Sequence, residues 1–209
     1  MREYYPLDTR DRHGYDGCVF VPANLEEALT TLGAVLDDRG HHASLALIGG
    51  GALLLAGYIQ RPTMDLDVVA IVRGKDLLTA EPLPKALIEA VHDVATALDL
   101  EPAWLNPGPT SILRLGLPQG FIERCEQRRY DALEVFIAGR LDQVALKLYA
   151  AADHWPARRN KHLDDLRRLR ASSEELRSAA AWCRTHDPSA GFLTMQLEPL
   201  LALLESTDD

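Results

Sequence analysis

Cysteine is scarce in this chain, and long apolar runs are missing from it. The three cysteines, Cys18, Cys125 and Cys183, lie far apart in 209 residues and form no C-x-x-C motif, which predicts free thiols in a reducing compartment. No apolar run reaches the roughly 20 residues that a transmembrane helix needs, and the polar N-terminus shows no signal peptide. We therefore expect a cytoplasmic protein that does not enter a membrane.

Lysine and arginine are outnumbered by aspartate and glutamate. With 22 Lys and Arg against 31 Asp and Glu, the net charge of −9 argues against a protein that coats nucleic acid non-specifically. Two segments, 124–129 and 157–170, are nevertheless locally basic. Such segments fit a phosphate-bearing ligand, and they also fit a solvated helix face.

Internal repeats and low-complexity tracts are absent, and the order of expected elements defines the fold class. After an irregular stretch at 1–22, a helix capped by Asn24 and Glu27 is expected to end near Gly40. Apolar patterns predict strands at 44–48, 63–72 and 130–139, with a short one at 111–115. Helices are expected at 52–57, 83–100, 141–154, 160–170, 173–186 and 190–205. This pattern predicts an α+β fold, with a small mixed sheet in residues 1–140 and a helical region, 141–209, packed on it.

The stretch from Leu45 to Val72 carries the strongest chemical signal. Residues i and i+2 of a strand share a face, so Asp65 and Asp67 present two carboxylates together while Leu66 and Val68 face the core. Two like charges on a half-buried strand are costly, and a divalent cation removes that cost. The three glycines at 49–51 let backbone amides approach a phosphate.

Each of these features alone usually has no function: D-x-D is common, and a triple glycine is most often a turn. Their order in a strand–glycine–helix–strand context favours phosphoryl or nucleotidyl transfer with Mg²⁺ or Mn²⁺.

The same stretch resembles the signature of nucleotidyltransferases of the DNA polymerase β superfamily, and most closely the AbiEii-like toxin nucleotidyltransferases of bacterial toxin–antitoxin and phage-defence systems. The matching positions are Gly49, Gly50, Ala52, Leu53, Gly57, Arg61, Thr63, Asp65 and Asp67. A second, looser match covers Lys147, Leu148, Ala150, Arg159, Lys161, Asp165 and Leu166. His162 departs from the family pattern, which has an aspartate there, and the segment Trp104–Asn106 is similar to that of small relatives.

The resemblance implies a polymerase β-type fold and a role for each matched residue. It assigns catalysis to Asp65, Asp67 and Asp165, and nucleotide binding to Gly49, Gly50, Arg61, Thr63, Lys147 and Lys161. The metal would be held by Asp65, Asp67 and a third carboxylate, either Asp131 or Glu134. Glu134 is favoured because it lies mid-strand between apolar residues, although the solvent face of an edge strand would explain it as well.

Lys147 and the basic segment after it have two interpretations each. Lys147 lies beside an apolar stripe formed by Leu141, Val144, Ala145 and Leu148; by itself it would be a surface residue, and with the resemblance it should enter a cleft and meet phosphates. Asp165 could act as a base, or could orient Lys147 or Lys161. His162 could pair with phosphate or lie on the helix surface. Arg158, Arg159 and Lys161 are expected nearer the acceptor.

The resemblance implies transfer of NMP from an NTP to an acceptor, either RNA, particularly the tRNA 3′ end, or a protein hydroxyl. An antitoxin protein is the implied partner. Two alternatives remain at this point: a toxin-like nucleotide-binding module that acts through a protein partner, and a degenerate scaffold without chemistry.

Overall fold

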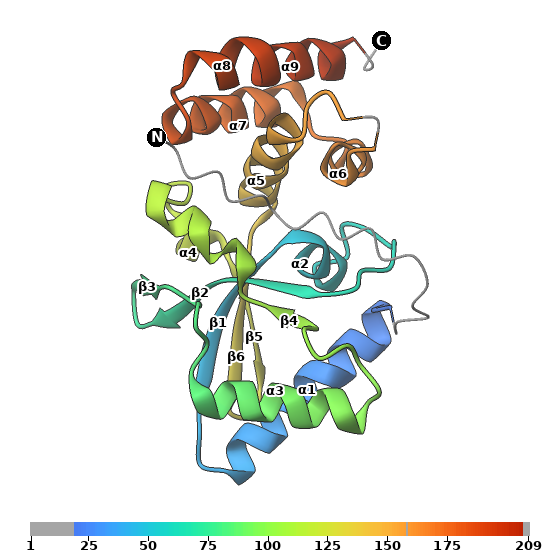
Figure 1. Cartoon of the computed structure of the whole chain (residues 1–209), viewed down its shortest axis with the longest axis vertical. Coiled ribbons are helices and arrows are strands. Elements are labelled where there is room, and N and C mark those ends of the chain that lie inside the picture. The colour runs from blue at the N-terminus through green and yellow to red at the C-terminus, as the bar shows by residue number, and fades with distance from the viewer. Residues whose placement is uncertain (1–18, 158, 207–209) are drawn as a thin grey trace.

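The computed structural model describes residues 19–157 and 159–206 and contains one mixed sheet with helices around it (Figure 1). The expectations for residues 1–18, including Cys18, and for Arg158 lie outside the described residues. Within those residues, no helix combines the length and the apolar character needed to cross a membrane. In chain order the elements are α1 (Pro22–Asp38), β1 (Ala43–Ile48), α2 (Gly49–Leu55), β2 (Leu66–Arg73), β3 (Asp76–Leu78), α3 (Lys85–Ala97), β4 (Leu105–Asn106), η1 (Gly108–Leu115), α4 (Phe121–Arg124), β5 (Glu126–Tyr130), β6 (Leu133–Ile137), α5 (Arg140–Asp153), α6 (Lys161–Leu169), α7 (Ser173–His186), α8 (Ala190–Phe192), η2 (Leu193–Leu197) and α9 (Glu198–Glu205).

The sheet has the strand order β3-β2-β1-β6-β5, and β4 pairs with β2 beside this path. The pair β1–β6 is parallel and the pairs β1–β2, β2–β3 and β5–β6 are antiparallel, which confirms the expected small mixed sheet. Strand β1 alternates its side chains between two apolar clusters: Leu45 and Leu47 join the larger core, and Ala46 and Ile48 join a smaller one. The sheet is therefore covered on both faces.

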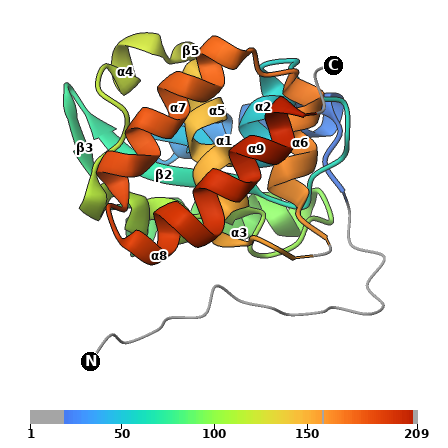
Figure 2. The same ribbon diagram turned by 90° about the horizontal axis from the view of Figure 1, so that it is seen from above.

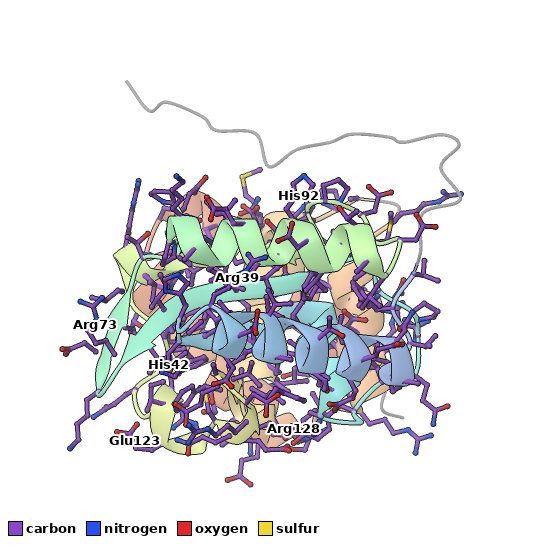
Figure 3. All side chains as sticks on the ribbon, turned by 90° about the horizontal axis from the view of Figure 1, so that it is seen from below. Arg39, His42, Arg73, His92, Glu123 and Arg128 are labelled. Carbon is purple, nitrogen blue, oxygen red and sulfur yellow. The ribbon has the colours of Figure 1, made fainter. Side chains whose placement is uncertain are left out.

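Helices α1 and α3 cover one face of the sheet and lie side by side (Figure 3). Helix α1 begins at Pro22, earlier than the predicted Asn24 cap. Proline suits the first helical turn because its missing N–H has no partner there anyway, and the Asn24 side chain accepts a hydrogen bond from the Val21 N–H at 2.7 Å. The cap therefore lies inside the first turn, and the predicted start was wrong by a few residues.

One predicted strand is shorter than expected, and another is wrong. The segment 130–139 is half of a hairpin, because the chain turns at Asp131, which has a φ of +48° and separates β5 from β6. Aspartate tolerates this left-handed conformation better than most residues do. The segment 111–115 lies in the 3₁₀ helix η1, which follows Pro107 and contains a proline in its first turn.

The C-terminal helices stack above the end of the sheet at which β1 and β6 finish (Figures 1 and 2). Helix α5 follows β6 directly and packs against α6 and α7. The larger apolar core runs without interruption from α1 through the sheet to α9, so the helices bury part of the same core as the sheet. The stripe on α5 is buried at Val144, Ala145 and Leu148, but Leu141 is half exposed, contrary to expectation.

Candidate functional site

The first turn of α2 lies against the aspartate pair. Strand β1 ends at Ile48, which pairs with Asp67, and Gly49 follows with a φ of +79°. A Cβ atom on Gly49 would lie 2.1 Å from Oδ2 of Asp67, so only glycine leaves room for that carboxylate. The three glycines form the first turn of the helix, whereas the sequence predicted that they precede it.

Asp67 lies in β2, and Asp65 directly precedes that strand, which begins at Leu66. Leu66 and Val68 are fully buried in the core, whereas Asp65 and Asp67 are only partly buried and lie outside it. Burial, and then the negative charge of Asp65, raise the pKa of Asp67 to about 6. The pair therefore holds negative charge at a cost, as a cation site does before its cation binds.

Asn106 positions Asp67, a role that the sequence did not predict. The short strand β4 pairs with β2 so that Asn106 lies opposite Asp67, and its Nδ2 donates to Oδ1 of Asp67 at 3.0 Å. Trp104 anchors this strand: its side chain is fully buried and donates to the Val91 carbonyl at 3.2 Å. A polar residue at the end of an apolar tryptophan-containing segment was the available signal.

Helix α5 turns two buried polar side chains, Gln143 and Lys147, toward the site. Their i, i+4 spacing puts them on one face of the helix. Oε1 of Gln143 accepts the Gly49 N–H at 3.3 Å, so this glycine amide already has a partner. Among the described residues, Nε2 of Gln143 has no hydrogen-bond partner although the side chain is fully buried. Gln143 was missed because a single glutamine in an amphipathic helix carries no signal by itself.

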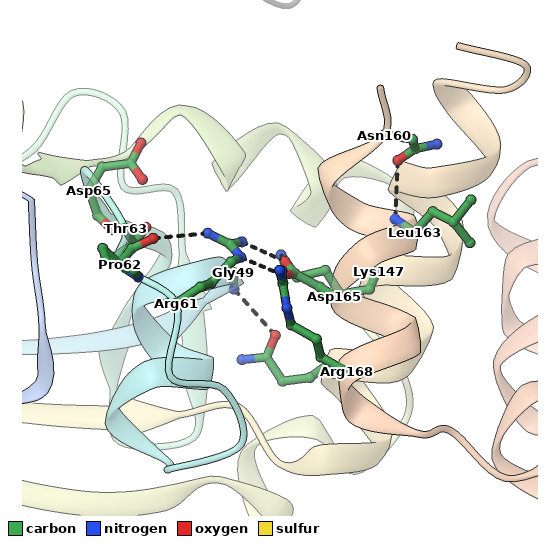
Figure 4. Close-up of polar contacts among 11 residues, drawn as sticks. Gly49, Arg61, Pro62, Thr63, Asp65, Lys147, Asn160, Leu163, Asp165 and Arg168 are labelled. Carbon is green, nitrogen blue, oxygen red and sulfur yellow. Dashed lines mark hydrogen bonds and ion pairs between the residues drawn. The ribbon is translucent and has the colours of Figure 1, made fainter. Parts of the chain in front are cut away.

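A buried charge network joins the sheet region to the C-terminal helices (Figure 4). Asp165 on α6 is fully buried and accepts two hydrogen bonds from Arg61, each at 2.7 Å, while Nζ of Lys147 lies 2.8 Å from Oδ2. Burial alone would raise the pKa of Asp165, but the hydrogen bonds and charges of Arg61 and Lys147 outweigh it and hold the pKa below its usual value. The expectation that Lys147 leaves the surface and enters the site is met by its burial.

The network corrects the catalytic role expected for Asp165. A general base must reach the proton that it removes, and the Asp165 side chain has no exposed surface, is held by Arg61 and Lys147, and lies 3.8 Å from Arg168. Asp165 instead orients Lys147 and Arg61. Lys161 is not in this network; it is exposed at the start of α6, and its positive charge opposes, without cancelling, the rise in the pKa of Asp67 that burial and Asp65 cause.

The third carboxylate expected in the site is not at the site. Glu134 pairs with Ser44, and the Ser44 hydroxyl donates to it at 3.3 Å. Ser44 lies four residues before Ile48, the partner of Asp67, which separates Glu134 from the aspartate pair by about 13 Å along the strand. The other candidate, Asp131, lies exposed in the β5–β6 turn.

Thr63 and Gly50 shape the loop before β2. The Thr63 side chain is buried and its hydroxyl donates to the Asp65 carbonyl at 3.3 Å, while its backbone pairs with Phe20. A Cβ on Gly50 would lie 3.0 Å from the Thr63 hydroxyl and 3.3 Å from Nη2 of Arg61. Thr63 thus holds the loop that carries Arg61 and Asp65.

His162, Arg124 and Arg159 differ in their charge state and in their exposure to solvent. His162 is not a cation: burial, followed by the charges of Lys147 and Lys161, lowers its pKa to about 3. Arg124, in the basic segment 124–129, forms a bidentate ion pair with Asp142, so it stabilises the fold. Arg159 is exposed in the loop before α6, and is free to meet a ligand from solvent.

The donor set of the site fits a cation that takes few protein ligands. In the described part of the chain, no group of three or more His, Cys, Asp or Glu side chains is arranged to hold a metal ion. Mg²⁺, however, is commonly bound through one or two carboxylates together with water and substrate phosphates, and Asp65 and Asp67 supply two.

Comparisons of the chain with protein-family models, with curated proteins and with solved structures give no match.

Proposed function

We propose that this protein is a metal-dependent nucleotidyltransferase of the polymerase β type, related to the AbiEii-like toxins, which transfers NMP from an NTP to an acceptor hydroxyl and releases pyrophosphate. The observation that carries the proposal is the position of Asp67: its carboxylate fills the space left by Gly49, and burial and then the nearby charge of Asp65, which directly precedes β2, raise its pKa. A glycine turn against a carboxylate pair brings phosphate and metal together.

The carboxylates Asp65 and Asp67 would hold Mg²⁺ or Mn²⁺, with the other ligand positions taken by phosphate and water. The bound cation would neutralise phosphate charge and polarise the phosphoryl group under attack. The protein prepares this position by holding two negative charges close together, because burial and Asp65 raise the pKa of Asp67. Asn106 keeps the Asp67 side chain in one orientation through its 3.0 Å hydrogen bond.

The cations of the site would neutralise the triphosphate. Lys147 is fixed in position by Asp165, and its ammonium group also interacts with Asp67. Lys161 is exposed, and its charge acts on the same aspartate. One lysine held in an ion pair and one exposed to solvent suit a substrate whose charge changes during transfer. We propose RNA as the acceptor, with a protein hydroxyl as the alternative and an antitoxin as the partner that would silence the enzyme.

The test is transfer of label from α-³²P-labelled NTPs, each supplied singly with Mg²⁺ or Mn²⁺, to total RNA, followed by denaturing gel separation. Wild-type protein should label RNA. Asp65→Asn and Asp67→Asn should abolish labelling while remaining folded, because each keeps the side-chain shape. Asp76→Asn, which removes an exposed carboxylate from β3, is the matched control and should label RNA as the wild type does.

A second candidate, a nucleotide-binding module without turnover, is favoured by one observation: the described residues bring no third carboxylate beside Asp65 and Asp67. Calorimetric titration separates the two functions. NTP binding that needs Asp67 but is accompanied by no labelling of RNA or protein would favour the binding module. Labelling that needs Asp67 excludes it.

A further inference from the structure

A pocket of about 700 Å³ opens between the loop after α2 and the C-terminal end of α6, and its charged lining is entirely basic. This volume lies within the range of about 300 to 1,000 Å³ that is usual for ligand pockets. The lining residues are Gly57, Tyr58, Ile59, Gln60, Arg61, Arg167, Arg168 and Arg170. Four guanidinium groups therefore surround one cavity in a protein whose net charge is −9.

These arginines are only partly neutralised. Arg168 lies 3.8 Å from the buried Asp165, which Arg61 and Lys147 already hold at shorter distances. Arg167 lies 3.7 Å from the exposed Asp164, a weak pair in solvent. In the part of the chain that the structure describes, the Arg170 side chain has no ion-pair partner. About half of the Arg167 and Arg168 side-chain surface is exposed, so both can meet a ligand.

The pocket is built on a rigid support. Arg140 on α5 donates from Nη2 to the carbonyls of Leu169 and Arg170, at 2.7 and 3.3 Å, and so ties down the end of α6. Its Nε is held by Glu175 at 2.6 Å. The guanidinium carbon of Arg140 also lies 5.9 Å from the centre of the Tyr58 ring. One residue thus fixes both the arginine-bearing helix end and the aromatic side of the pocket.

The pocket adjoins the candidate site through Arg61. This residue lines the pocket, binds Asp165 in the charge network, and lies 3.3 Å from the position that a Cβ on Gly50 would take. The pocket and the glycine turn are therefore linked by the Arg61 side chain, which reaches both.

We propose that the arginine pocket binds the phosphates and one base of the single-stranded nucleic-acid end that accepts the nucleotide. Guanidinium groups pair with phosphate oxygens in a planar, two-bond geometry, and an aromatic ring such as Tyr58 stacks on any base. The lining carries four arginines, of which Arg61 is already paired with Asp165, so the footprint is short and involves three to four phosphate charges, which gives a salt slope of about −2 to −3. The inference rests on the proposed function, since it names the acceptor class of that site.

The test measures the affinity of fluorescein-labelled single-stranded RNA and DNA oligomers of about eight nucleotides by fluorescence anisotropy at several salt concentrations. The key variant is Arg167→Gln with Arg170→Gln. Two lost phosphate contacts should weaken binding about 25-fold at about 0.1 M salt and flatten the salt slope by about 1.4. The oligomer that binds more tightly to wild-type protein identifies the acceptor as RNA or DNA.

The matched control is Arg73→Gln with Lys75→Gln, which makes the same change in net charge. Arg73 is exposed at the far end of β2, six residues beyond Asp67, or about 20 Å along the strand. The control should bind the oligomer as wild type does. Equal losses in both double variants, no loss in the arginine variant, or no binding by wild-type protein would each overturn the proposal.

A thermal shift with Mn²⁺ and NTP keeps this inference separate from the proposed function. The arginine double variant should retain the wild-type shift, because Asp65, Asp67 and Lys147 are unchanged. Loss of the NTP shift with unchanged oligomer affinity would assign the pocket to the nucleotide and overturn the inference alone. Absence of any NTP or metal response in wild-type protein would instead remove the proposed function.

Discussion

Arg61 and Asp165 lie 104 residues apart in the chain and form a bidentate ion pair in which both nitrogen–oxygen distances are 2.7 Å. Arg61 comes from the loop that leads into β2, and Asp165 comes from α6 (Figure 4). Lys147, on a third element, shares the same carboxylate. The pair therefore connects the sheet to the C-terminal helices at the place where the candidate site lies.

Asp165→Asn should destabilise the protein by about 3 to 5 kcal/mol, because it leaves Lys147 buried without its counter-charge and weakens the hold on Arg61. The measurement is urea unfolding followed by circular dichroism. Asp164→Asn is the matched control: it is the preceding residue, has the same charge and is exposed, and its removal should cost less than about 1 kcal/mol. The double variant, with Lys147→Met added to Asp165→Asn, should recover part of the lost free energy of unfolding. If the effects of the two substitutions simply add, the two side chains are not energetically coupled.

Asp67→Asn should stabilise the metal-free protein at pH 7.5 by about 1 to 3 kcal/mol. The folded-state pKa of Asp67 is about 6, above its ordinary value of 3.8, so the ionised carboxylate opposes folding at neutral pH. As the pH falls through 6, the wild-type carboxylate takes up a proton in the folded state, and the advantage of asparagine shrinks. Urea unfolding in EDTA at pH 7.5 and pH 5 measures this difference. A difference that does not depend on pH would contradict the raised pKa of Asp67. Asp76→Asn, which removes an exposed carboxylate from β3, is the matched control.

Gly49→Ala should abolish the thermal shift caused by Mn²⁺ with NTP and should destabilise the fold. The added Cβ would lie 2.1 Å from Oδ2 of Asp67, and the φ of +79° adds a cost of about 1 kcal/mol. Gly40→Ala separates the two effects, because Gly40 has a φ of +66° but nothing within 4 Å of the added atom. It should lose stability by the backbone cost alone and keep the ligand response. Equal ligand responses in the two variants would remove the link between Gly49 and Asp67.

Lys161→Gln should lower NTP affinity roughly 3- to 10-fold, corresponding to about 1 kcal/mol of lost charge pairing, with little change in melting temperature. Lys161 is exposed and acts on Asp67, so its loss removes a cation from the site without opening the core. Calorimetric titration with NTP measures the effect. Lys85→Gln, which removes an exposed lysine from the start of α3, should leave the affinity unchanged. Equal affinity in both variants would mean that Lys161 does not meet the nucleotide.

The local pattern of the sequence was enough to predict several parts of this protein. The burial of Leu66 and Val68 in the core, with the partly buried Asp67 between them, follows from the two-residue period of a strand. The limits of α5, α6 and α7 follow from apolar spacing and lie within one or two residues of those predicted. Such features depend on neighbours a few residues apart, so the sequence contains all the information that they need.

Tertiary structure decided the features that depend on which segments meet. Glu134 lies in a strand as expected, but it is the second residue of β6, and the parallel pairing of β6 with β1 places it beside Ser44, at a distance from the aspartate pair. Asp131 turns the chain where a continuous strand was predicted. Strand register is a property of two segments together, and no spacing within one of them reveals it.

The same reason explains the parts of the site that the sequence left out. Asn106 reaches Asp67 only because β4 pairs with β2, and Gln143 reaches Gly49 only because α5 packs over the end of β1. Asp165 is a positioning residue because Arg61 and Lys147, which come from two other parts of the fold, both bind its carboxylate. The sequence by itself determined which side chains carry charge and which face of each element they occupy. The packing of distant segments decided which of those charges meet, because a buried charge must find its partner wherever the fold provides one.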